Sequence, residues 1–246
     1  MATFKCHGLI IKKNNIGESD RILTIFTDKF GKVRAKAKGV RKTLSRLAGH
    51  LDLFCLTNLV LAEGKTLDVI IEAQTIECFP ILGQDLKKTA AVFYLAELVD
   101  KTTGEHEPNL KIFHLLLKVL QKILLKNDEI YLRYFEINLL KYLGFRPHFG
   151  RCMHCQEKLK PTRNFFSPKE GGVLDIDCRQ EDPTAIEISV SAIKLLRLML
   201  QEDLDKFSKI KASIEVKKEM KRILSLFLNY TLEKKLSSAG FLEKIK

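Results

Sequence analysis

The chain has 246 residues, of which 46% are apolar, so it is long enough to bury more than one hydrophobic core. Its formal net charge of +12 favours nucleic acid or another anionic surface as a partner, without distinguishing DNA, RNA and the ribosome. No apolar stretch approaches the roughly 20 residues of a membrane-spanning helix, and no signal-peptide segment opens the chain. We therefore expect a cytoplasmic protein without a membrane partner.

Residues 1–80 contain short β-rich segments separated by turn signals. The segments are HGLIIKK, RILTIFT, KVRAKAK, DLFCLTNLVLAE and LDVIIEA. Five short strands in this length predict a small barrel, and the oligonucleotide-binding (OB) barrel has five strands. A five-stranded SH3-like barrel would give much the same pattern.

A basic run covers residues 29–46, which include eight lysines or arginines and no acidic residue. Between Lys32 and Lys38 cations alternate with small apolar residues, and the period of two predicts a strand with one cationic face. This face could bind phosphates, or it could be a solvated edge whose lysines prevent unwanted strand pairing. The candidate nucleic-acid-binding residues are Lys32, Arg34, Lys36, Lys38, Arg41, Lys42 and Arg46.

Other residues of the barrel segment have simpler expected roles. Phe26, Phe30 and Phe54 could stack on bases, but we expect them in the core. Cys6, Cys55 and Cys78 lie singly in apolar segments. We expect them to be reduced core residues, as is usual in the cytosol.

The hydrophobic period changes to a helical one after about residue 84. Apolar stripes predict three helices before residue 146, the last of them beginning near Asp128 and ending at Gly144. Two further amphipathic segments follow Pro183. We therefore expect a helical body made of residues 84–146 and 187–246, interrupted by an irregular insertion at 147–186.

The insertion contains three cysteines in a pattern typical of metal sites. Its spacing is C-x2-C-x19-D-x2-C, which matches a four-cysteine zinc site in which Asp175 takes the third place. One structural zinc held by Cys152, Cys155, Asp175 and Cys178 is the first interpretation, with His148 or His154 as a substitute donor. A knuckle that folds without metal and a redox-active C-x2-C remain alternatives.

Signals of catalysis are sparse. The sequence contains no G-x-x-x-x-G-K-[ST], G-x-G-x-x-G, G-x-S-x-G or H-E-x-x-H motif. Glu18 and Asp20 could hold a metal, but we expect a turn closed by Asp20 and Arg21. The sequence thus predicts a binding protein rather than an enzyme, and a metal-dependent enzyme using Glu18, Asp20 or the cysteine cluster is an alternative.

In order and spacing, these segments resemble RecO, the recombination-mediator family of bacterial DNA repair. GESDRI at 17–22 resembles the family motif G-E-x-D-R, and KVRAKAKGVRK followed by SRLAGHLDLF resembles its basic third strand and the next segment. ELVD at 97–100 fits the first helix of its central domain. RYFEINLLKYLGFRP at 133–147 fits the helix before its cysteine knuckle. The resemblance covers nearly the whole chain.

The resemblance implies an α+β multi-domain protein with an N-terminal OB-like barrel, a helical body and a zinc-ribbon-like insertion. It implies binding of single- and double-stranded DNA, annealing of complementary strands, and action near the nucleoid with RecR. It further implies contact with the acidic tail of single-strand binding protein and help in loading RecA. An RNA-binding or ribosome-associated OB protein is the alternative that charge and barrel allow equally.

At the level of residues, the resemblance implies DNA contact by the seven cations of the basic run. Arg133 matches an arginine that would help receive the acidic tail, and a surface salt bridge is the competing role for it. The knuckle departs from the family pattern, because proteins with a full site have four cysteines and this chain has Asp175 in the third position.

Overall fold

The structure is a computed structural model that describes residues 2–79, 85–126, 128–207 and 210–232, together with Ser238 and Gly240. The chain divides into two compact units, one of residues 1–125 with 236–246 and one of residues 126–235. The sequence places domain boundaries near 84 and 146, where the type of secondary structure changes. The two compact units instead divide after residue 125, because the first two helices belong with the barrel.

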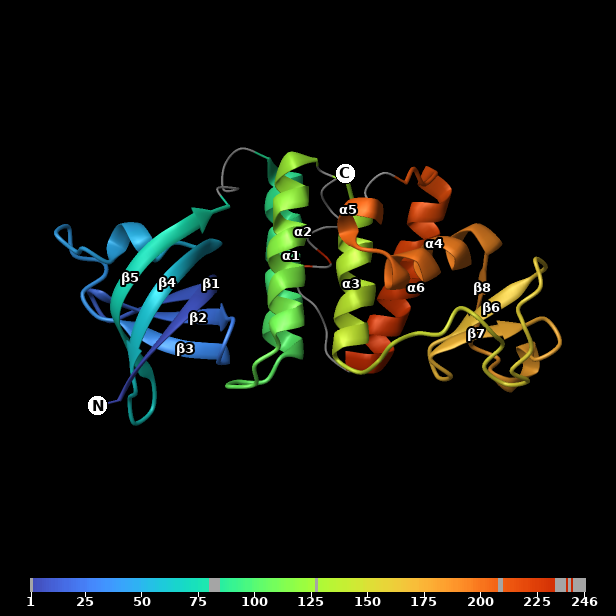
Figure 1. The fold of residues 1–246 in the computed structure, drawn as a ribbon, viewed down its shortest axis with the longest axis horizontal. Coiled ribbons are helices and arrows are strands. Elements are labelled where there is room, and N and C mark those ends of the chain that lie inside the picture. Colours follow the sequence, from blue (N-terminus) through green and yellow to red (C-terminus); the bar gives the residue numbers. More distant parts are fainter. Residues whose placement is uncertain are drawn as a thin grey trace. The chain divides into compact units, whose positions relative to one another are not determined.

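The first unit contains a closed five-stranded barrel (Figure 1). Its strands are β1 (Thr3–Ile16), β2 (Asp20–Thr27), β3 (Gly31–Ala37), β4 (Cys55–Ala62) and β5 (Asp68–Cys78). They follow the order β1-β2-β3-β5-β4, and all neighbours are antiparallel except β3 and β5. This five-stranded, OB-like barrel confirms the predicted fold class.

The barrel core is built by alternate residues along the strands, which face inward. Ile25 of β2 is paired with Val33 of β3, and Leu23 with Ala35; all of these side chains are fully buried. Gly8 of β1 faces the same core, where a Cβ atom would lie 2.4 Å from Cγ2 of Ile25. Small and branched residues therefore pack together in the barrel interior.

Helices α1 (Leu86–Thr102) and α2 (Leu110–Leu125) pack on the outside of the barrel. Asp85 caps α1, since its side chain accepts hydrogen bonds from the backbone N–H groups of Lys87 and Lys88. The ring of Phe54 contacts Phe93 of α1 at 5.0 Å between centroids. The ring of Phe26 likewise contacts Phe113 of α2 at 6.1 Å. Both barrel phenylalanines are thus core residues, as expected.

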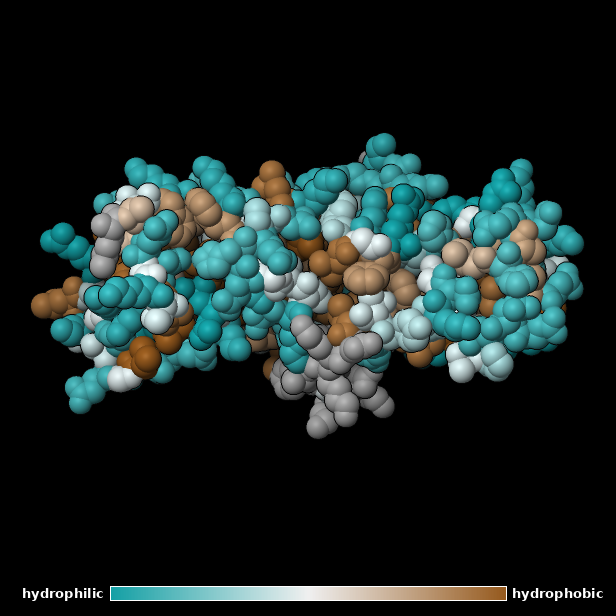
Figure 2. All heavy atoms as spheres, turned by 90° about the horizontal axis from the view of Figure 1, so that it is seen from below, coloured by the Kyte–Doolittle hydropathy of each residue, from teal (hydrophilic) through white to brown (hydrophobic). Residues whose placement is uncertain are grey.

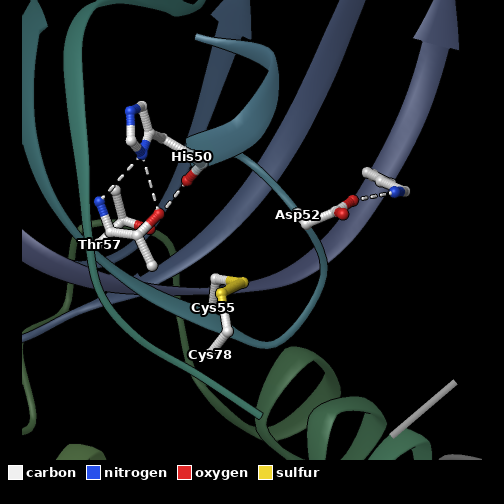
Figure 3. Close-up of a disulfide and its surroundings, with 7 residues drawn as sticks. His50, Asp52, Cys55, Thr57 and Cys78 are labelled. Carbon is white, nitrogen blue, oxygen red and sulfur yellow. Dashed lines mark hydrogen bonds and ion pairs between the residues drawn. A yellow bond between two sulfur atoms is a disulfide. The ribbon is translucent and has the colours of Figure 1, made fainter. Parts of the chain in front are cut away.

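A disulfide joins Cys55 of β4 to Cys78 of β5, which are directly paired in the register of the two strands (Figure 3). The expectation that these two cysteines are reduced and unpaired was therefore wrong, because antiparallel pairing of β4 with β5 brings the start of β4 beside the end of β5. Cys6 is a buried free thiol, as expected, and burial raises its pKa to about 12.

The second unit combines helices with a small antiparallel sheet. The helices are α3 (Ile130–Tyr142), α4 (Val190–Gln201), α5 (Leu204–Phe207) and α6 (Ile214–Leu232). The sheet has the order β7-β6-β8, with β6 (Asn164–Ser167), β7 (Gly172–Asp175) and β8 (Ile186–Ile188). Phe166 of β6 packs edge-on against Phe227 of α6, so the insertion shares a core with the helices.

The ends of α3 lie within two residues of the positions that the sequence predicts. The side chain of Asp128 accepts a hydrogen bond from the N–H of Ile130 at 3.1 Å, and Gly144 adopts a positive φ of 95° after the last turn. Among the described residues, no helix has the length and apolar character needed to cross a bilayer.

Candidate nucleic-acid interface and metal site

Strand β3 has the predicted alternation, but its first outward cation is buried. Lys32 is 8% exposed, and its Nζ lies 3.3 Å from Oδ1 of Asp100 in α1 while donating to the carbonyl oxygen of the same residue. Next to it, a Cβ on Gly31 would lie 2.2 Å from the carbonyl oxygen of Glu107. Lys32 therefore fastens α1 to the barrel and is not available to a ligand.

Lys36 is also engaged within the barrel. Its Nζ lies 2.9 Å from Oδ2 of Asp20, and both side chains are only partly exposed. Two of the seven candidate cations thus neutralise carboxylates of the protein itself. The sequence could not indicate the Lys32 pair, because Asp100 lies 68 residues further along the chain.

The remaining five cations are exposed, and none of them forms an ion pair with a carboxylate of the described residues. They are Arg34 on β3 and Lys38, Arg41, Lys42 and Arg46 in the following turn. Residues 38–46 are called the basic turn from here on. Cations without carboxylate partners can neutralise phosphates at little cost, so this strand and turn form the candidate nucleic-acid interface.

The basic turn is held in place by the loop that contains the GESDRI motif. The N–H of Gly39 donates to Oδ1 of Asp20 at 2.7 Å, and the N–H of Arg41 donates to the carbonyl of Ser19 at 2.9 Å. The guanidinium of Arg41 also donates to the carbonyl of Gly17. Asp20 therefore closes a turn, as expected, and Arg21 instead bonds Asn15.

These contacts lower the pKa of Asp20 to about 2, chiefly through the hydrogen bond from Gly39 and then through Lys36. Because a lowered pKa favours the folded state above the ordinary value, we expect this stabilisation to be full above about pH 4 and to vanish near pH 2. Asp20→Asn should therefore reduce stability at pH 7 but not at pH 2, measured by urea unfolding across this range. Glu18→Gln, which changes an exposed carboxylate nearby, is the control. If the free energy of unfolding of Asp20→Asn depends on pH as that of the wild type does, Asp20 does not stabilise the turn through its charge.

Two other residues predicted from the sequence are engaged in contacts within the protein. Phe30 is half-buried and packs on Phe4 with ring centroids 4.5 Å apart, so it is not a free stacking platform. Arg133 is 4% exposed, and its Nη2 lies 2.7 Å from Oε1 of Glu136 one turn later in α3. Of its two expected roles, this geometry fits a salt bridge, although a buried rather than a surface one.

The cysteine cluster of the insertion is assembled as the spacing predicts. One ligand atom from each of Cys152, Cys155, Asp175 and Cys178 lies within 4.8 Å of all the others. Sγ of Cys155 is 3.1 Å from Oδ2 of Asp175, and Oδ1 of Asp175 accepts a hydrogen bond from the N–H of Cys178 at 2.9 Å. The neighbouring backbone is fixed, because the N–H of Met153 donates to the carbonyl of Val173 in β7.

These donors fit a single metal ion. A tetrahedral zinc with Zn–S bonds of about 2.3 Å separates its sulfur ligands by roughly 3.8 Å, so a small contraction of the cluster suffices. In the protonated cluster, burial and the nearby Asp175 raise the pKa of Cys178. Burial alone would raise the pKa of Asp175, but hydrogen bonds from Cys155 and Cys178 outweigh it and lower that pKa. The cluster can bind a metal ion.

Comparison with known proteins places the chain in one family. The family model "Recombination protein O N terminal" matches residues 1–79, and "Recombination protein O C terminal" matches residues 83–239. Among curated proteins, a DNA repair protein RecO of Dehalococcoides mccartyi (strain ATCC BAA-2266 / KCTC 15142 / 195) is 37% identical over 98% of this chain and 96% of its own length.

Two further relatives give the same result. DNA repair protein RecO of Roseiflexus sp. (strain RS-1) is 35% identical over 99% of this chain and 86% of its own length. That of Desulforamulus reducens is 31% identical over 100% of this chain and 96% of its own length. Together with the OB-like barrel and the site geometry, these matches confirm the resemblance, and the chain belongs to the RecO family of DNA repair and recombination proteins.

Proposed function

We propose that this chain is a DNA-binding protein of recombinational repair that carries out no catalysis of its own. It binds single- and double-stranded DNA and anneals complementary strands. With RecR it helps to load RecA onto DNA coated by single-strand binding protein, whose acidic tail it contacts. The observation that carries the proposal is the group of five exposed cations without carboxylate partners on β3 and the basic turn.

The proposed binding mode is largely independent of sequence. Cations that meet phosphates release condensed counterions, and this contribution requires no particular base. Bringing two complementary strands to one cationic surface reduces their mutual repulsion, which is sufficient for annealing. Such a protein would act where the chromosome is, in the cytoplasm at the nucleoid.

Salt dependence tests the number of contacts. If the five cations each neutralise one phosphate of a single strand, the logarithm of the binding constant should fall with log salt at a slope of about −3.5. Fluorescence anisotropy of a labelled single-stranded oligonucleotide at several salt concentrations gives the slope. Competition by RNA of the same sequence is the control, because an RNA-binding protein should use the 2′-hydroxyl and prefer RNA. A slope near zero or a preference for RNA would contradict the proposal.

For the insertion, we propose one structural zinc bound by Cys152, Cys155, Asp175 and Cys178. The donor chemistry supports this choice, since thiolates favour zinc over magnesium or calcium. Bound there, the ion would cross-link the knuckle at Cys152–Cys155 to the segment after β7. It would stabilise the second unit without taking part in a reaction.

A further inference from the structure

Leu44, in the middle of the basic turn, is 94% exposed, more than any other large hydrophobic residue among those described. Its apolar neighbours in the same turn region behave differently. Val40 is 1% exposed, and Leu47 packs against the barrel core. The two flanking residues therefore anchor the turn, and Leu44 alone points into water. Figure 2 shows a mostly hydrophilic surface on which hydrophobic groups form separate spots.

This exposure is imposed by a hydrogen-bonded turn. The N–H of Lys42 donates to the carbonyl of Gly39 at 3.1 Å, and the N–H of Ser45 donates to the carbonyl of Lys42 at 3.0 Å. The N–H of Ala48 continues the series to the carbonyl of Ser45. With the base of the turn clamped by Asp20, the backbone presents Leu44 in a fixed position. The backbone of the turn would therefore lose little conformational freedom when Leu44 meets a ligand.

The charges around Leu44 select the ligand. Arg41, Lys42 and Arg46 lie within three residues of it, and all are exposed and without a carboxylate partner. A partner must therefore carry negative charges, and within about one side-chain length of them it must present an apolar face. A single strand of nucleic acid has this combination, because its phosphates alternate with base faces that are free to contact an apolar group. In a duplex the base faces are stacked, and only phosphates and groove edges remain.

We propose that Leu44 contacts the bases of single-stranded DNA while the cations of the basic turn bind its phosphates. Leu44 thereby gives the interface a preference for strands with unstacked bases over duplex. This inference rests on the DNA binding proposed above and adds the residue that distinguishes the two forms of DNA.

Leu44→Ala tests the contact directly. We expect affinity for single-stranded DNA to fall about fivefold, below the loss for an aromatic stacking residue, with duplex affinity unchanged. The salt slope should stay the same, since no charge is removed. Leu125→Ala, which truncates another leucine that is 82% exposed at the end of α2, is the matched control and should change neither affinity. Equal binding by Leu44→Ala and wild type, or an equal loss for both forms of DNA, would overturn the inference.

Leu44→Lys separates an apolar contact from a purely electrostatic one. If the turn acts through charge alone, the added cation should strengthen binding to both forms of DNA. If Leu44 contacts bases, duplex binding should strengthen while single-strand binding does not. Stronger binding to both forms of DNA would overturn the inference.

Leu44→Trp gives a direct readout, because the chain has no tryptophan. We expect saturating single-stranded DNA to quench the emission strongly and to protect it from acrylamide, and duplex to do neither. Unchanged emission in a variant that still binds single-stranded DNA would overturn the base contact. Protection by anionic vesicles in place of DNA would assign the exposed leucine to a lipid surface instead. Anisotropy of a labelled oligonucleotide with the wild-type protein tests DNA binding without the tryptophan. If the wild type binds no DNA in that assay, the proposed function itself is wrong.

Discussion

Replacing Arg34, Lys38 and Lys42 together by glutamate is expected to weaken binding to single-stranded DNA by at least about 100-fold while the barrel remains folded. Neutralising three of five phosphate contacts lowers the affinity for a single strand by about 100-fold at about 0.1 M salt, and reversing the charges lowers it further. The two cations that remain, Arg41 and Arg46, should leave a salt slope of about −1.4. Anisotropy with a labelled oligonucleotide measures both quantities.

The choice of residues for this variant follows from the structure. Lys36 is left intact because a glutamate there would face Asp20 and destabilise the barrel, and Lys32 because it binds Asp100. The matched control is glutamate at Lys158, Lys160 and Lys194, which are exposed in the second unit. Each triple variant changes the net charge by the same amount, three times two units, from +12 to +6. Equal losses in the two variants would show that net charge, and not this interface, determines binding.

Loss of the metal is expected to unfold the insertion while the barrel stays intact. Structural zinc sites contribute on the order of 10 kcal/mol in small domains, so the short strands β6–β8 should depend on the ion. We expect about one zinc per chain in purified protein, and its removal by chelation or by Cys152→Ser should lower hydrogen-exchange protection of β7 at least about 100-fold. The amides of β1–β4 serve as the internal reference.

The third ligand offers a graded test of the same site. Asp175→Cys completes a four-cysteine set and should bind zinc more tightly, whereas Asp175→Ala should bind it more weakly. Chelator competition ranks the three proteins. Metal-free protein with native exchange protection in β7 would instead favour a knuckle that folds without metal.

Features carried by short spacings were predictable from the sequence. The alternation of β3 placed Val33 and Ala35 in the core, and the C-x2-C and D-x2-C spacings brought four ligands together. Local chemistry also placed the start of α3 near Asp128 and its end near Gly144. In each case the deciding interaction joins residues close in the chain or is fixed by the period of a single element.

Features that depend on contacts between distant segments were not predictable. Lys32 looks like an exposed cation until α1 supplies Asp100, and Arg133 looks exposed until α3 is buried. The pairing of Cys55 with Cys78 depends on the register of β4 and β5, which shifts at two irregularities. Leu44 shows no signal in the sequence, because whether an apolar residue in a turn is buried depends on where its flanking residues anchor.

The disulfide between Cys55 and Cys78 bears on how the barrel responds to mechanical load. Cys78 is the last residue of β5, immediately before the chain leaves the barrel toward α1. A force applied to the chain after Cys78 would be carried by the disulfide. The hydrogen bonds between β5 and β4 would then bear little of it. Tension on this exit could therefore not peel β5 from the barrel at this end, and the reduced protein would resist such force only through strand pairing.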